Sequence, residues 1–232
     1  LLHAVAVVKA GVFTITKIVF YIFGTDFLLN TAPAEWLPYV ASFTVIAASV
    51  VALRQTNLKR LLAYSTVAQL SYVVLAAGLF QPLAIMGAAI HIVAHGFGKI
   101  TLFFAAGSIY TATHKTEIPQ LDGIGRRMPW TMAAFTIGAL SMIGLPPTAG
   151  FVSKWYIVSG ALQAGSGIAV AAIVVSTVLN AAYFLPILYR AWFRPYDPED
   201  PVRRGEAPMP VVLAVTAAAM LTLAFFFYHE PA

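Results

Sequence analysis

Residues 91–104 read HIVAHGFGKITLFF and place two histidines and a lysine at intervals of four inside a run that is otherwise apolar. His91, His95 and Lys99 are spaced i, i+4 and i+8, so on a helix they share one face over about 12 Å of axis. The apolar run around them, 83–111, is longer than the roughly twenty residues that cross a hydrocarbon core of about 30 Å. The stretch therefore predicts a membrane-spanning helix that carries three bases through its middle.

The overall composition agrees with a membrane protein. The 232 residues are 60% hydrophobic and 10% charged, with a mean hydropathy of +0.82, whereas soluble domains carry about 25% charged residues. Continuous apolar runs favour helices over an alternating barrel pattern. The lack of cysteine excludes thiol redox chemistry, disulfides and Cys-ligated clusters within these residues. A net charge of +5 can indicate nucleic-acid binding, but most of the lysines and arginines lie in loops between spans, so we expect no nucleic acid.

Apolar segments divide the chain into eight candidate helices. Seven of them are long enough to span a membrane, but 151–163 is too short. That segment lies between GLPPTAG (144–150) and QAGSG (163–167), whose prolines and glycines end helices. We therefore expect an all-α polytopic bundle with a discontinuous helix near 146–166. The candidate helices are 1–23, 36–53, 61–80, 83–111, 129–145, 151–163, 167–193 and 210–228.

Basic loops give an independent test of this arrangement, because Lys and Arg accumulate on the cytoplasmic side. If 151–163 and 167–193 form one broken crossing, all three basic loops share a side and the Pro146–Pro147 turn points to the outer side. If 151–163 spans alone, the third basic loop falls on the opposite side. We therefore expect a multi-pass protein of a bacterial inner membrane, with the broken crossing at 151–193. The basic loops are 54–60, 112–128 and 190–209, and the loops without a base are 24–35 and 80–82.

Titratable side chains divide between the loops and the spans. All nine acidic residues fall in predicted loops or at the end of the chain, whereas the spans contain only bases. A charge at mid-bilayer costs at least about 3 kcal/mol on insertion scales, so such residues usually face the bundle interior and serve ion or proton movement. Outside the three basic loops, the bases in the apolar segments are His3, Lys9, Lys17, His91, His95, Lys99 and Lys154.

These bases differ in how strongly they indicate function. Either histidine alone is equally well explained by hydrogen bonds to neighbouring helices. Lys99 lies too deep in its segment to reach an interface, whereas Lys154 could snorkel outward from the start of a half-helix. Lys17, near the end of its segment, is expected to be an interfacial anchor. Because histidine titrates near neutrality, the two histidines and Lys99 together form a ladder of proton-exchanging groups.

Metal binding and enzyme catalysis are the weaker alternatives. Two histidines at i and i+4 can share an ion, but zinc needs three or four ligands, and a zincin needs the glutamate that Ile92 replaces. No intramembrane carboxylate, cysteine or nucleophile accompanies the bases. We therefore expect no metal, no cofactor and no active site in this chain, and a transporter subunit rather than an enzyme by itself.

Four strings resemble the antiporter-like membrane subunits shared by respiratory complex I, membrane-bound hydrogenases and Mrp-type monovalent cation/proton antiporters. The FVSKWY and VVKAG versions are more similar to the Mrp-type D subunit and its relatives than to complex I itself. The four strings are LLHAVAVVKAGVF (1–13), LRQTNLKRLLAYSTVAQLSYV (53–73), HIVAHGFGKITLFFAAGSI (91–109) and LSMIGLPPTAGFVSKWYI (140–157).

The resemblance implies two inverted five-helix repeats, each with a broken helix. Residues 1–23 would end the first broken helix and 151–193 would form the second, running in the opposite direction. The antiporter-like domain would cover 1–194, namely the second repeat and the end of the first, with a polar linker and a final span at 195–232. The first repeat, with its glutamate and lysine, would be missing, so this C-terminal fragment is not expected to transport by itself.

The resemblance also implies roles for the buried bases. Lys99 would be the central proton-exchanging lysine, with His91 and His95 relaying to it. His3 and Lys9 would connect the two halves of the protein, and Lys154 would end the second broken helix.

From these roles we expect a subunit that moves protons, in exchange for Na⁺ or another monovalent cation, beside other membrane subunits of a hetero-oligomeric complex. The alternative within this class is a proton-pumping subunit that takes its energy from redox chemistry in other chains of a complex I-like or hydrogenase assembly. A different alternative is a non-conducting scaffold whose buried bases only join helices through hydrogen bonds.

Overall fold

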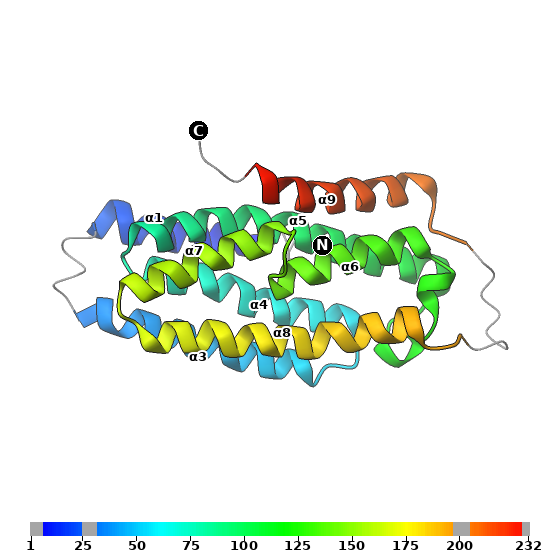
Figure 1. Ribbon diagram of the computed structural model, residues 1–232, viewed down its shortest axis with the longest axis horizontal. Coiled ribbons are helices and arrows are strands. Elements are labelled where there is room, and N and C mark those ends of the chain that lie inside the picture. The colour runs from blue at the N-terminus through cyan, green and yellow to red at the C-terminus, as the bar shows by residue number, and fades with distance from the viewer. Residues whose placement is uncertain (1–6, 25–31, 197–204, 229–232) are drawn as a thin grey trace.

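The computed structural model describes residues 7–24, 32–196 and 205–228, which form a bundle of helices aligned along one long axis (Figure 1). Among the described residues, five helices are long and apolar enough to cross a membrane: α3, α4, α5, α8 and α9. The prediction of an all-α polytopic bundle is therefore confirmed. The elements are α1 (Val8–Lys17), the π-helical η2 (Ile18–Phe23), α3 (Ala32–Leu53), α4 (Leu58–Ala77), α5 (Pro82–Thr113), the 3₁₀ turns η3 (Ile118–Leu121) and η4 (Ile124–Arg126), α6 (Pro129–Ile143), α7 (Ala149–Gln163), α8 (Gly167–Phe193) and α9 (Met209–Phe227).

The discontinuous helix consists of α6 and α7. Each has 15 residues, which is about 22 Å and too short to cross a core of about 30 Å. Both pack along α5, one on each half, because Gly98 of α5 lies against Met142 of α6 while Gly87 lies against Ile157 of α7. Figure 1 shows the two short helices end to end, with their connection near the middle of the bundle.

The predicted pairing of 151–163 with 167–193 is therefore wrong, although the prediction of a discontinuous helix in this part of the chain is confirmed. The 27 residues of α8 cross alone, and the Pro146–Pro147 turn lies near mid-bundle rather than on the outer side (Figure 1). The apolar run 129–145 imitates a full span in sequence. The helix formed by this run is short because Gly144, in the left-handed region at φ +91°, ends α6, and the two prolines that follow prevent the helix from continuing.

The direction argument for inverted repeats also changes. The crossing formed by α6 and α7 runs away from the end that holds the basic loops, and α1 with η2 runs the same way (Figure 1). The predicted opposite directions of 1–23 and the broken crossing are therefore wrong, because that prediction took α8 as part of the break. The two-repeat organisation and the domain division at residue 194 stay predictions.

The three basic loops meet at one end of the bundle, as predicted. Asn57 donates to Glu117 (Nδ2 to Oε1, 2.9 Å), which joins the first loop to the second. Arg190 and Arg194 both contact Asp122, at 3.1 and 3.3 Å, which joins the third loop to the second. The prediction of a shared end holds although the predicted helix pairing was wrong. Whether α7 is paired with α8 or with α6, the chain crosses the bundle twice between the second and third basic loops and so returns to the same end.

The bundle has an apolar exterior and a partly polar interior. Phe43, Val178 and Leu213, on three different helices, are 73%, 63% and 62% exposed. Buried serines, threonines, amides and bases lie inside instead. A protein in water shows the reverse tendency, so this distribution agrees with an exterior that does not face water.

Candidate functional site

The histidines of α5 face the break between α6 and α7. His91 and His95 are 1% and 0% exposed, and their rings stack with centroids 6.0 Å apart and an interplanar angle of 20°. The i, i+4 spacing on a regular helix produces this stack, so the predicted shared face is confirmed. Both ring nitrogens of His95 have no hydrogen-bond partner among the described residues.

Lys99 lies one turn further along the same face and is completely buried. Its Nζ donates to the carbonyl oxygen of Leu62 at 2.9 Å and to Ser65 Oγ, both on α4. Hydrogen bonds to two neutral oxygens compensate only part of the cost of burying an ammonium. Lys99 also acts electrostatically on His95, so the charge on the lysine and the charge on the histidine influence each other.

Lys154 lies in the second turn of α7 and turns back onto the end of α6. Its Nζ donates to the carbonyl oxygens of Met142 (2.9 Å) and Ile143 (3.0 Å), and it lies 5.1 Å from the centre of the Tyr72 ring. The last carbonyls of a helix have no partner within the helix, and the helix dipole favours a cation there. The side chain is buried rather than snorkelling, so Lys154 caps the broken helix from inside the bundle.

Ser153 connects the histidines to this capped end. Its Oγ donates to the carbonyl oxygen of Gly150 at 3.0 Å and lies 2.9 Å from His91 Nδ1. Because a hydroxyl has one hydrogen, the hydrogen between these side chains belongs to His91 Nδ1. His91 then keeps its proton on Nδ1, and its Nε2 is the nitrogen that can accept another.

The remaining predicted bases, Lys9, Lys17 and His3, are less buried than the histidines of α5 or lie outside the described residues. Lys9 on α1 is half-buried, and its Nζ lies so close to α5 that a methyl group on Gly96 would lie 2.6 Å from it. The electrostatic field of Lys9 reaches both histidines. Lys17 is exposed, over the Phe13 ring at 5.2 Å, which agrees with a surface anchor. His3 lies outside the described residues.

Several uncharged polar side chains line the same interior but were not predicted from the sequence. Ser65, Gln69 and Tyr72 follow one face of α4 at i, i+4 and i+7, and all three are completely buried. Asn180 and Tyr183 lie one turn apart on α8, where Tyr183 donates its hydroxyl hydrogen to Asn180 Oδ1. The helical spacing of these polar side chains was the available signal, and a search for charged residues alone overlooks it.

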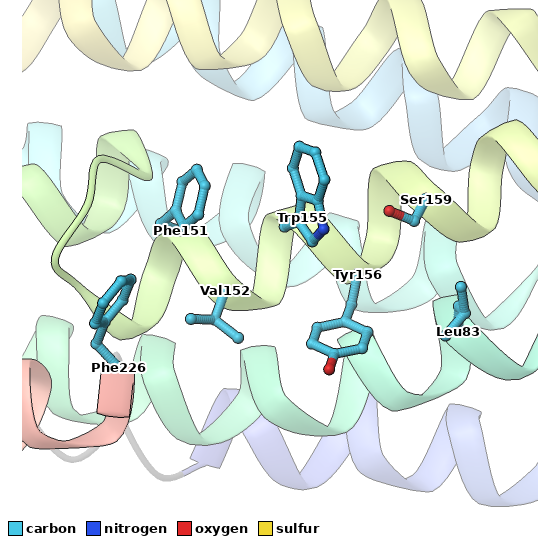
Figure 2. Close-up of a pocket in the computed structure, with 7 residues that line it drawn as sticks. All are labelled: Leu83, Phe151, Val152, Trp155, Tyr156, Ser159 and Phe226. Atoms are coloured by element: carbon cyan, nitrogen blue, oxygen red, sulfur yellow. The ribbon is translucent and has the colours of Figure 1, made fainter. Parts of the chain in front are cut away.

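A separate cavity lies on the outer side of α7. It has a volume of about 330 Å³. Figure 2 shows that four of the labelled lining side chains are aromatic, namely those of Phe151, Trp155, Tyr156 and Phe226. None of its described lining residues is a lysine or histidine, so it holds no group of the buried chain of bases. Across the described parts of the chain, no three His, Cys, Asp or Glu side chains lie together as metal ligands. The lining residues are Leu83, Phe151, Val152, Trp155, Tyr156, Ser159 and Phe226.

The sequence is similar to known membrane subunits. It is 38% identical over 208 residues to NADH-quinone oxidoreductase subunit N of Desulforudis audaxviator, which covers 89% of this chain and 41% of that protein. It is 31% identical over 201 residues to F(420)H(2) dehydrogenase subunit N of Methanosarcina mazei, covering 83% and 40%. The chain thus spans about two fifths of the length of these relatives.

Solved structures agree on the fold. A chain of respiratory complex I from Thermus thermophilus matches with a TM-score of 0.65 and 30% identity, over 85% of this chain and 44% of that one. A chain of the Mrp complex from Dietzia sp. DQ12-45-1b matches with a TM-score of 0.79 over 94% and 48%, and at 22% identity it shows the fold alone. Residues 1–180 match the family described as NADH:quinone oxidoreductase/Mrp antiporter, TM. This match covers more than three quarters of the chain, which therefore belongs to the NADH:quinone oxidoreductase/Mrp antiporter family of membrane subunits.

Proposed function

We propose that the protein containing this chain translocates protons across a membrane, with Lys99, Lys154 and Lys9 as its proton-exchanging groups and His91 and His95 as relays. One observation carries the proposal: a line of buried bases crosses the middle of the bundle and meets a broken helix. Intramembrane ionisable groups are costly and typically functional. Two of these bases, Lys99 and Lys154, bind only neutral oxygens among the described residues.

The geometry suggests how a proton would move. A neutral His91 holds a proton on Nδ1 beside Ser153 and accepts another at Nε2, so the ring takes a proton on one side and releases one on the other. With ring centroids 6.0 Å apart, transfer between the histidines needs a ring rotation or one bridging water, because donors and acceptors exchange protons at about 3 Å.

Like charges explain why the lysines would act in turn. Lys9 and Lys154 both act electrostatically on His91, and Lys9 and Lys99 both act on His95. In a low-dielectric interior, a charge on one base raises the cost of a charge on the next. A proton that arrives at one base would therefore favour proton release from its neighbour, and this passes charge along the line.

The proposed proton translocation could be driven either by redox chemistry in other subunits or by exchange against a monovalent cation. The named relatives include NADH-quinone oxidoreductase and F(420)H(2) dehydrogenase subunits, so they support a redox-driven pump better than the exchange of Na⁺ expected from the sequence. We therefore propose a proton-pumping subunit of a respiratory assembly in a bacterial cell membrane, with other membrane subunits as partners. Exchange against a monovalent cation is the second candidate, because the matched family also includes Mrp antiporters.

Inverted membrane vesicles with the full-length protein in its complex distinguish the two. We expect vesicles supplied with NADH to acidify inside, as seen with a pH-sensitive dye, and the signal to disappear in a strain without the protein. NaCl, LiCl or KCl added without NADH to vesicles with an imposed pH gradient should leave the gradient unchanged. Collapse of the gradient on adding one of these salts, together with no NADH-driven acidification, would instead establish antiport.

A further inference from the structure

The last turn of α6 holds a carbonyl with an unusual number of donors. Met142 O accepts from Lys154 Nζ at 2.9 Å, from Gln69 Nε2 at 3.0 Å and from Asn180 Nδ2 at 3.3 Å. The donors come from three different helices, α7, α4 and α8, and both amides belong to side chains that are completely buried. The free end of the broken helix is thus the meeting point of three elements.

The three donors compete for this oxygen, because a carbonyl has two lone pairs. Lys154 has a second acceptor in Ile143 O at 3.0 Å, but the described structure gives the amide of Gln69 no other acceptor. The two amides are enough to occupy both lone pairs of Met142 O. The carbonyl would therefore stay bonded if the lysine withdrew.

We propose that Gln69 and Asn180 are positioning residues that hold the broken end of α6 while Lys154 exchanges its proton. The inference rests on the proposed function of Lys154. A neutral amine binds a carbonyl less strongly than an ammonium does, so each proton release loosens the cap. The amides keep Met142 O satisfied at that moment, so they lower the cost of the neutral state and leave the helix end in place for the next proton.

Other groups around Lys154 do not provide this function. From α5, His91 bonds to Ser153 and acts on Lys154 by its charge alone, and from α4 the Tyr72 ring contributes its face rather than a hydrogen bond. On α8, Tyr183 donates to Asn180 and so orients its amide toward Met142. Lys9 on α1 adds positive charge to the same region. None of α1, α4, α5, α6, α7 and α8 contains an Asp or Glu.

Near-isosteric substitutions test the inference in the full-length protein within its complex. Gln69→Met and Asn180→Leu each remove one competing donor. Gln69→Met also leaves the hydrogen bond from Tyr183 to Asn180 intact, whereas Asn180→Leu removes it. The remaining ammonium then holds the carbonyls more firmly and gives up its proton less readily. We expect the pH optimum of NADH-driven acidification to move up by about half a pH unit in each variant, and further in the double variant.

Two further variants make the outcomes distinct. Thr222→Val removes a buried hydroxyl whose bond stays within α9, and it should leave the pH optimum unchanged. Lys154→Met tests the proposed function itself, and normal acidification in this variant would overturn that function and the inference together. If Lys154→Met is inactive but the amide variants lose activity equally at every pH, or keep the wild-type optimum, the inference alone is overturned.

Discussion

Replacement of Lys99 with methionine is expected to lower proton translocation by roughly tenfold or more, because the central position can then no longer bind a proton. Methionine keeps a flexible apolar stem, so the packing between α4 and α5 is retained. Ser65 Oγ still donates to the carbonyl oxygen of Leu62 at 3.0 Å. We therefore expect the complex to assemble in normal amounts and to oxidise NADH while acidifying the vesicles poorly.

The matched control is Lys17→Met, which removes an exposed lysine on α1 whose contact is the Phe13 ring. This variant should acidify the vesicles at the wild-type rate. A Lys99→Met complex that assembles and acidifies as fast as the control would show that Lys99 does not exchange protons. Failure of Lys99→Met to assemble, with normal activity in Lys99→Arg, would support the scaffold alternative.

Substitutions at Lys154 should separate capping of the helix from exchange of protons. Arginine keeps a positive charge and several donors near Met142 O and Ile143 O, but it does not release its proton in proteins. Methionine removes both abilities. We expect Lys154→Arg and Lys154→Met to lose acidification by roughly tenfold or more, as measured in NADH-energised vesicles.

The arginine variant should also keep the thermal stability of the wild-type complex more closely than the methionine variant does, because Ile143 O loses its side-chain donor only in the latter. Wild-type acidification by Lys154→Arg would contradict the account, since it would leave Lys154 with a capping role only.

The sequence was sufficient for the central helix and for the buried basic face on it, whereas the proton-exchanging role of that face stays a prediction. The spacing of His91, His95 and Lys99 is local, and one regular helix converts it directly into a buried face. The shared end of the basic loops was also predictable, because it depends only on the number of crossings. These predictions needed no knowledge of how separate helices pack.

The predictions that failed or were missed depend on packing between helices. The run 129–145 is apolar enough to imitate a span, and only the position of α7 along α5 shows that it is half of one. The donors to Met142 O come from helices far apart in sequence. In the sequence alone, Asn180 therefore cannot be distinguished from any other polar residue of α8. Its contact with Met142 O becomes apparent only when α8 is placed beside the break. Charge marked the lysines in the sequence, whereas the amides were marked only by the helical spacing of uncharged polar residues.

The central claim is that protons pass through the histidines between Lys99 and Lys154, and His95 tests it most directly. Its ring nitrogens have no hydrogen-bond partner among the described residues, so His95→Phe removes the relay without breaking a bond of the described structure. The measurement is the ratio of vesicle acidification to NADH oxidation in the assembled complex. The account predicts normal assembly with this ratio reduced by roughly tenfold or more. An unchanged ratio would contradict it.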